Sequence, residues 1–365
     1  MLENDALSNN KFQLDSLDGL RGFAVLFVFL SHTSNVGIYF LPGANFSGIG
    51  TFGVFLFFIL SSFLLTYPFL IKKENAISKK YLFNYFLRRF FRIFPLYLVY
   101  LLLALFSTII FKNIGNFNKP IGVPFPLNLT DFTQHILLQQ GKGVTWSIMV
   151  EFRYYFILPF LGILFSILLK NKILPCLLTV IILSIISQYI WPDIDKIEKG
   201  LRLGVYFPIF LMGSLMAVIH YNWVQLNNDS KASMQKTIEI AGILCLLIIF
   251  FLTPSSISIL AGYTVNAAEI HNHYILISML WCIILFSSIH GKGLLRRFFE
   301  SAALRYLGFI SFSFYLFHII GIRIVNHIPA VNESLHGPLI LLVTILISHI
   351  SYKLIEQPSS KISFK

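Results

Sequence analysis

Residues 50–70 read GTFGVFLFFILSSFLLTYPFL and include no charged side chain. A helix needs about 20 mainly apolar residues to cross the hydrocarbon core of a bilayer. This run is long enough to do so, and it therefore predicts a transmembrane helix.

Comparable apolar runs recur on both sides of this one. Of the 365 residues, 56% are hydrophobic and only 12% are charged, and the mean hydropathy is +0.76. A soluble domain normally carries about 25% charged residues, and no polar stretch here is long enough to bury a core. We therefore expect a single domain, residues 1–365, with the all-α fold of a polytopic transmembrane bundle. The ten candidate spans are residues 17–39, 50–70, 89–111, 146–169, 173–190, 203–220, 238–252, 273–289, 307–325 and 339–355.

Basic residues predict the orientation of these spans. With the N-terminus in the cytoplasm, 20 of the 28 lysines and arginines fall on the cytoplasmic side and 7 on the other, with Arg153 inside a span. Cytoplasmic loops of membrane proteins are enriched in Lys and Arg, so we predict that both termini are cytoplasmic. The net charge of +12 comes from these loops, so membrane lipids are expected partners and nucleic acid is not. The longest predicted external loop, residues 112–145, is a candidate cover for an outward-facing site.

Cysteine and histidine give no sign of a metal site. The three cysteines lie inside apolar runs, and no pair of the ten histidines has the spacing of a zinc site. Cysteine in such a position normally fills space in the core. We therefore expect neither a bound metal ion nor a permanently bound cofactor.

Arg21 and His32 lie in the first predicted span, although a charged side chain near the bilayer centre costs about 2.5–3.5 kcal/mol to insert. The step of eleven residues from Arg21 to His32 turns a helix by about 1100°, which is some 20° past three full turns, and advances it by about 16 Å. Both side chains therefore lie on one face, with Arg21 near the cytoplasm and His32 past mid-membrane. In a structural interpretation, Arg21 snorkels to the membrane surface and His32 packs against another helix. In a functional one, Arg21 anchors an anion and His32 acts as a general base.

Arg88, Arg89 and Arg92 stand at the cytoplasmic end of the third predicted span. Spacings of three and four residues gather them on one side of a helix. Such a basic cluster sets topology or contacts anionic lipid headgroups. Guanidinium groups also bind phosphate in bidentate fashion, so a phosphate or pyrophosphate site is the second interpretation.

The fourth predicted span carries a polar stripe. Ser147, Glu151 and Tyr155 follow at four-residue spacing, which places them on one helical face. Glu151 either pairs with an arginine of another helix or orients a catalytic histidine.

Polar residues also share one face of the ninth predicted span. Ser311, Tyr315 and His318 lie on that face, and Ser313 does not. They form either a hydrogen-bonded packing seam between helices or part of the cavity that His32 lines. Glu356, just after the last span, is explained by helix termination and snorkelling.

Six short stretches form an ordered series along nearly the whole chain. They are LDGLRG at 17–22 with His32, GVFLFFILSSF at 53–63, RFFR at 89–92, WSIMVE at 146–151, SFSFYLFH at 311–318 and YKLIEQP at 352–358. This series resembles the motifs of acyltransferase family 3. Three positions depart from the family pattern: Phe55 replaces an acid, Ser62 replaces a glycine, and Phe152 replaces a second acid after Glu151.

The resemblance implies an enzyme that transfers an acyl group, usually acetyl. The donor would be cytoplasmic acetyl-CoA, and the acceptor a hydroxyl of a carbohydrate such as lipopolysaccharide or another surface polysaccharide or glycolipid. It also implies a multi-pass protein of the bacterial inner membrane. Some relatives carry an additional SGNH-type hydrolase domain, and we expect none in this chain.

Spacing and resemblance together give each candidate residue a role. The CoA phosphates are expected at the cytoplasmic mouth, and the thioester near a general base deep in the first helix. The residues expected to bind CoA are Arg21, Arg88, Arg89 and Arg92. Those expected in catalysis are His32, Glu151 and His318, and those expected to contact substrate are Tyr155, Tyr315 and Ser311.

Two other classes of function are compatible with the sequence. A transporter or flippase for a glycolipid or glycan precursor would use the buried charges as a substrate or proton pathway. Broken helices and inverted repeats would favour it, and neither is evident in the sequence. A purely structural membrane protein would not need the buried His, Glu and Arg residues.

Overall fold

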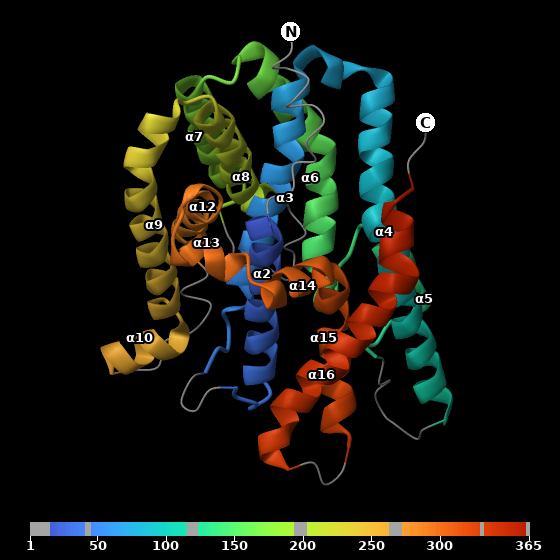
Figure 1. Ribbon diagram of the computed structural model, residues 1–365. Coiled ribbons are helices and arrows are strands. Elements are labelled where there is room, and N and C mark those ends of the chain that lie inside the picture. The colour runs from blue at the N-terminus through green and yellow to red at the C-terminus, as the bar shows by residue number, and fades with distance from the viewer. Residues whose placement is uncertain are drawn as a thin grey trace.

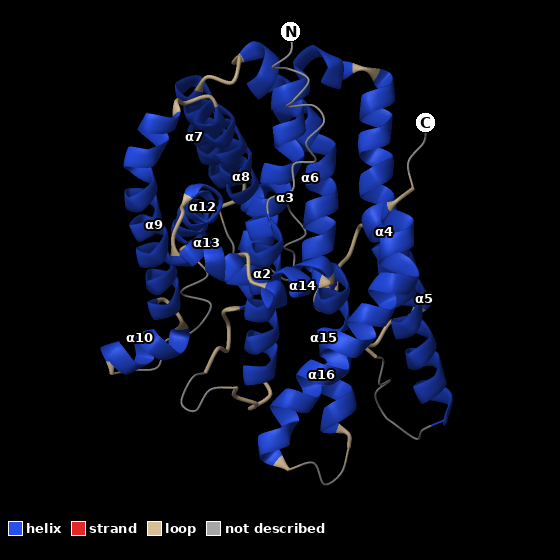
Figure 2. Cartoon of the chain, in the orientation of Figure 1, coloured by secondary structure: helices blue, strands red, loops and turns tan. Residues whose placement is uncertain are grey.

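The structure, a computed structural model, describes residues 15–40, 45–114, 123–192, 203–262, 272–328 and 332–362. Every regular element within these ranges is a helix, and none of their residues forms a strand (Figure 2). The all-α class that the apolar runs predict is confirmed.

The helices follow the predicted spans, with short helices between them. Their bounds are α2 (Asp15–Ser34), α3 (Gly50–Lys72), η1 (Lys73–Ile77), α4 (Lys79–Ile114), α5 (Leu129–Ile136), α6 (Thr145–Ile163), η2 (Leu164–Leu168), α7 (Ile173–Ile190), α8 (Leu203–Val224), α9 (Asn228–Phe251), α10 (Pro254–Ala261), α12 (Tyr274–His290), α13 (Leu294–Phe299), α14 (Ala302–Phe309), α15 (Ser311–Asn326), α16 (Glu333–Ser351), η4 (Tyr352–Glu356) and α17 (Gln357–Ser360).

Seven of the described helical segments are long and apolar enough to cross a membrane, or eight if the bent pair α14–α15 counts as one span. The first predicted span forms α2 and the eighth forms the 17-residue α12, so each of the ten predicted runs is mostly helical. The chain is thus a polytopic helical membrane protein. Ten crossings and two cytoplasmic termini stay predictions.

Two helices form the centre of the bundle, whereas others face outward. In α3 and α8, 72% and 78% of the most apolar stretch is buried, against 17% in α7 and 22% in α9. The side chains exposed on α7, and on α9 from Ile240 onward, are mainly Ile, Leu and Phe. Helices that are apolar on all sides are typical of membrane spans, so these two present a lipid-facing surface.

Close backbone contact fixes α2 against α13 and α14, which cross the bundle beside it (Figure 1). A Cβ atom at Gly22 would overlap the carbonyl of Leu304, and one at Gly308 would overlap the carbonyl of Asp18. Glycine lacks a Cβ, so the helices can approach each other at these two points. The contact fixes the position of Arg21, which precedes Gly22 on α2.

The ninth predicted span, residues 307–325, is not one continuous helix. The chain bends by 84° between α14 and α15. The contact of Gly308 with α2 keeps α14 across the bundle, and the bend brings Ser311, at the start of α15, within hydrogen-bonding distance of Arg21. The expected single span is therefore broken at Ile310. The sequence does not show the break, because residues 307–325 are mostly apolar and include no proline.

Candidate active site

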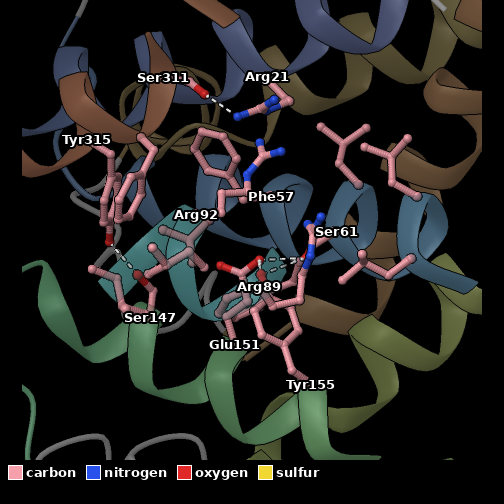
Figure 3. A pocket seen from close by; sticks show the side chains of 18 residues that line it. Arg21, Phe57, Ser61, Arg89, Arg92, Ser147, Glu151, Tyr155, Ser311 and Tyr315 are labelled. Atoms are coloured by element: carbon pink, nitrogen blue, oxygen red, sulfur yellow. Dashed lines mark hydrogen bonds between the residues drawn. The ribbon is translucent and has the colours of Figure 1, made fainter. Parts of the chain in front are cut away.

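A cavity with about 800 Å³ of empty space, part of which is open to solvent, lies between α2, α3, α4, α6 and α15 (Figure 3). Its lining includes three arginines and one glutamate, so its net charge is positive. We call it the arginine cavity. Its charged and hydroxyl-bearing residues are Arg21, Ser61, Arg89, Arg92, Ser147, Glu151, Tyr155, Ser311 and Tyr315.

The three arginines enter this cavity from two helices. Arg21 on α2 donates from Nη2 to Ser311 Oγ over 3.0 Å, and its Nη1 lies 3.9 Å from a carboxylate oxygen of Asp18. Arg89 and Arg92 enter from α4, three residues apart and therefore on neighbouring sides of the helix. The planar guanidinium group matches two phosphate oxygens at once. The cluster is therefore suited to a ligand with several phosphate groups.

Glu151 forms the centre of a hydroxyl network in the same cavity. Its Oε1 accepts hydrogen bonds from Ser61 Oγ at 2.5 Å and from the Tyr155 hydroxyl at 2.6 Å. Arg89 lies close enough to interact with this carboxylate electrostatically. The partners that the described structure gives Glu151 are therefore hydroxyls and an arginine, as the first of the two interpretations expects, and a role for it in orienting a catalytic histidine stays a prediction.

Tyr315 forms a wall of the arginine cavity. Its hydroxyl donates to the carbonyl of Val144 over 2.9 Å, which leaves its oxygen to accept from Ser147 Oγ at 2.7 Å. The predicted polar faces of α6 and α15 thus meet at this pair. Tyr315 and Val54 also line a second cavity, so the two cavities adjoin at these side chains.

The second cavity has about 930 Å³ of empty space, part of which is open to solvent. His32 lies in its wall, and we call it the histidine cavity. It is lined from α2, α3, α4, α6 and α15 and from the chain that precedes α6, including Pro124, Phe125 and Gly143. The described part of the loop expected to cover an outward-facing site therefore does contribute to a cavity wall.

His32 and His318 form a hydrogen-bonded pair in which Nδ1 of His32 lies 2.9 Å from Nε2 of His318. Nδ1 of His318 lies 2.7 Å from the carbonyl of Tyr315, so it carries the proton, and Nε2 accepts from His32. Nδ1 of His32 is then the donor, which leaves Nε2 of His32 as an unprotonated base. Because His318 is fully buried, His32 alone of the pair lines the cavity.

The family model for an acyltransferase domain matches residues 14–353, which is nearly the whole chain. The chain belongs to this acyltransferase family. Among curated proteins, this family member is 26% identical to the O-acetyltransferase OatA of Staphylococcus aureus, over 96% of its own length and 58% of the relative. It is 25% identical to the peptidoglycan O-acetyltransferase OatA of Listeria monocytogenes, over 96% and 56%. The chain thus spans less than three fifths of these relatives, and no solved structure matches it.

Most of the predicted site residues of this acyltransferase-family protein lie together. Arg88 does not, because it is exposed and lines neither cavity. Successive helical residues point about 100° apart, so α4 turns Arg88 outward where Arg89 faces the cavity. The residues that line the arginine cavity as expected are Arg21, Arg89, Arg92, Glu151, Tyr155, Ser311 and Tyr315.

Two polar residues of the family member have roles that the sequence did not reveal. Ser61, the first serine of the stretch at 53–63, donates a hydrogen bond to Glu151. Glu356 does not snorkel, because it is buried and accepts a 2.6 Å hydrogen bond from Ser313 Oγ. Both pairings join helices far apart in sequence, which spacing along one helix does not show. Among the described residues, no three His, Cys, Asp or Glu side chains gather into a metal-binding group.

Proposed function

We propose that this protein is an O-acetyltransferase of the bacterial cytoplasmic membrane that moves acetyl from cytoplasmic acetyl-CoA to a hydroxyl of a cell-surface glycan. The observation that carries the proposal is the pair of adjoining cavities, one holding three arginines and the other holding a histidine base. Family membership and the names of the two bacterial relatives support the reaction type.

The arginine cavity is the proposed donor site. Coenzyme A carries a pyrophosphate and a 3′-phosphate, and three guanidinium groups are available for them in Arg21, Arg89 and Arg92. The pantetheine arm would then pass Val54 and Tyr315, the two residues that line both cavities. The thioester would reach the histidine cavity, where the acceptor binds.

The proposed transfer uses Nε2 of His32 as a general base. It takes the proton of the acceptor hydroxyl while the hydroxyl oxygen attacks the thioester carbonyl carbon. The C–S bond breaks and CoA leaves as a thiolate, which takes up the proton that His32 gained. The products are the acetyl ester and free CoA, and His32 is again an unprotonated base. His318 acts through His32, because its Nε2 accepts the Nδ1–H of His32 and holds the ring in one orientation and tautomer.

Transfer of label from radioactive acetyl-CoA tests the proposal directly. Purified protein in nanodiscs should move acetyl to a surface glycan such as peptidoglycan fragments or lipopolysaccharide, and alkali should release the label as acetate from an ester. The Arg89→Gln variant should need more acetyl-CoA for the same rate. Absence of ester formation with every glycan class, from protein that is correctly inserted, would refute the proposal.

A transporter or flippase for a glycolipid is the second candidate, and one observation favours it. The 84° break between α14 and α15 beside the partly buried Arg21 resembles the interrupted helices of transporters. Proteoliposomes separate the two functions. Movement of a labelled glycolipid without acetyl-CoA, and without ester formation, would support transport in place of acyl transfer.

A further inference from the structure

The histidine cavity contains polar groups that the proposed transfer does not use. Tyr100 and Thr51 line it, and neither of their hydroxyl oxygens has a hydrogen-bond partner in the described structure. Both oxygens are buried in the cavity wall, and the Tyr100 side chain is fully buried. Because a buried hydroxyl without a partner costs free energy, a small shift of these side chains toward a ligand that brings hydroxyl groups of its own is favourable.

Aromatic rings form another part of the same lining. Trp146 lies in the wall and is held from behind by Tyr206 and Phe58, with ring centroids 5.2 and 6.1 Å away. Phe125 is held by stacking on His135, with centroids 5.8 Å apart. Rings fixed in this way offer flat apolar faces without a further loss of side-chain entropy. A sugar ring, which has hydroxyl edges and an apolar C–H face, matches both features of the cavity.

Arg323 gives the cavity a positive charge. It stands on α15 and lines the cavity, whose described lining residues include no aspartate or glutamate. It also lies close enough to the Tyr100 hydroxyl to interact with it electrostatically. Arginine in a partly buried position prefers a carboxylate or a phosphate, to which it donates two parallel hydrogen bonds.

Arg323 and His32 line the same cavity from different helices. On the continuous helix α15, Arg323 follows Ile319 by four residues and Tyr315 by eight, and all three line the cavity because this spacing places them on one helical face. An anionic group on Arg323 and a hydroxyl at His32 can therefore belong to one saccharide in this cavity.

We propose that the histidine cavity selects an anionic saccharide, whose carboxylate or phosphate binds Arg323 while a ring hydroxyl faces His32. The inference rests on the proposed function for the identity of this cavity as the acceptor site. It adds the chemical class of the acceptor. Tyr100 and Thr51 hydrogen-bond to further hydroxyls, and Trp146 packs on the sugar face.

Calorimetry on the protein in nanodiscs tests this selection without requiring turnover. The carboxylate probe is oligogalacturonate, the phosphate probe is an oligomer of glycerol phosphate, and the neutral control is methyl-esterified oligogalacturonate, which keeps the hydroxyls and masks the charge. At least one anionic probe should bind about tenfold or more tightly than the neutral control, since a hydrogen bond to a charged group is the stronger kind. The probe that does so identifies which anion the cavity takes.

Variants assign that preference to one side chain. Arg323→Gln should remove the difference between charged and neutral probes, and Arg323→Lys should keep part of it if the variants unfold at the wild-type temperature. Lys112→Gln is the matched control, because Lys112 is an exposed cation near the end of α4 and does not line the cavity. Equal binding of charged and neutral probes, binding of none, or a preference that survives Arg323→Gln would overturn the inference.

Acetyl transfer to the same probes separates failure of this inference from failure of the proposed function. Transfer to neutral and charged saccharides at equal rates would leave the acetyltransferase in place and remove the anion selection. Charge-selective binding that depends on Arg323, without any acetyl transfer, would leave the anion site in place and remove the acetyltransferase.

Discussion

The two cavities that adjoin at Tyr315 are built differently. In the arginine cavity, polar groups largely bond to one another, as Ser61 and Tyr155 do with Glu151. In the histidine cavity, the hydroxyls of Tyr100 and Thr51 have no partner in the described structure. Internal bonding holds a site in one shape before its ligand arrives, whereas unpaired groups need the ligand to complete them.

The two cavities also differ in the elements that form their walls. Helices supply the whole lining of the arginine cavity, but the chain before α6 supplies part of the histidine cavity. Loops vary more readily than the helices they connect. This construction fits the proposed function, in which the arginine cavity holds the acetyl-CoA donor and the histidine cavity holds the glycan acceptor.

The largest expected effect comes from removing the base of the histidine cavity. His32→Ala should lower kcat by about 10²–10⁴-fold, the usual contribution of a general base. Binding of acetyl-CoA should change little, because His32 does not line the arginine cavity. Single-turnover acetyl transfer and equilibrium binding of acetyl-CoA measure the two effects. His349→Ala is the control, since the partly exposed His349 bonds Tyr306 and lines neither cavity. Near-normal transfer by His32→Ala would refute the base.

The next effect should separate the two neighbouring arginines of α4. Arg89→Gln removes a charge from the arginine cavity and should raise KM for acetyl-CoA about 10–100-fold, the equivalent of one or two charged hydrogen bonds. Arg88→Gln should leave KM unchanged, because Arg88 is exposed outside the cavity. Steady-state kinetics with acetyl-CoA and with 3′-dephospho-CoA thioesters measures this difference. Equal effects of the two substitutions would show that the basic cluster acts through the membrane surface.

The sequence predicts the helices and the polar faces well, because each depends on residues that are neighbours in the chain. Uncharged runs mark the spans, and the spacing of Ser311 and Tyr315 places both on one side of α15, where the structure has them lining one cavity. Contacts between helices do not follow from such spacing. The pairing of Ser313 with Glu356 joins residues 43 positions apart, and the bend at Ile310 depends on the contact of Gly308 with α2.

The third prediction tests the contact of Gly308 with α2. Gly308→Ala places a Cβ atom on the carbonyl of Asp18, and should push α14 away from α2 and destabilise the protein by roughly 1–3 kcal/mol, the usual cost of overpacking. Because α14 positions Ser311 beside Arg21, KM for acetyl-CoA should also rise. Thermal unfolding in detergent and steady-state kinetics measure the two effects. At Gly337 an added Cβ would make only ordinary contact with Phe40, so Gly337→Ala should match the wild type.

The smallest expected effect concerns the part of the histidine cavity that a short loop helix supports. His135, in α5, is buried, and its Nε2 accepts the backbone N–H of Lys142 over 3.0 Å. Burial lowers the pKa of His135 below its ordinary value of 6.5, and Lys142 nearby acts in the same direction. The folded loop therefore binds the proton less well than the unfolded loop does. Its stability is fully present above about pH 6.5 and falls as the pH drops through that value.

Limited proteolysis with a protease active from pH 5 to 8 measures this loss. Cleavage between residues 123 and 144 should accelerate below pH 6.5 relative to cleavage near residue 227, a loop that contains no histidine. His135→Gln should flatten the pH dependence, because it removes the titrating ring next to the Asp131–Lys142 ion pair. If the acceleration persists in His135→Gln, another group controls the loop. If it disappears, the histidine cavity has a wall that loosens in acid, whereas the arginine cavity, built entirely from helices, lacks such a wall.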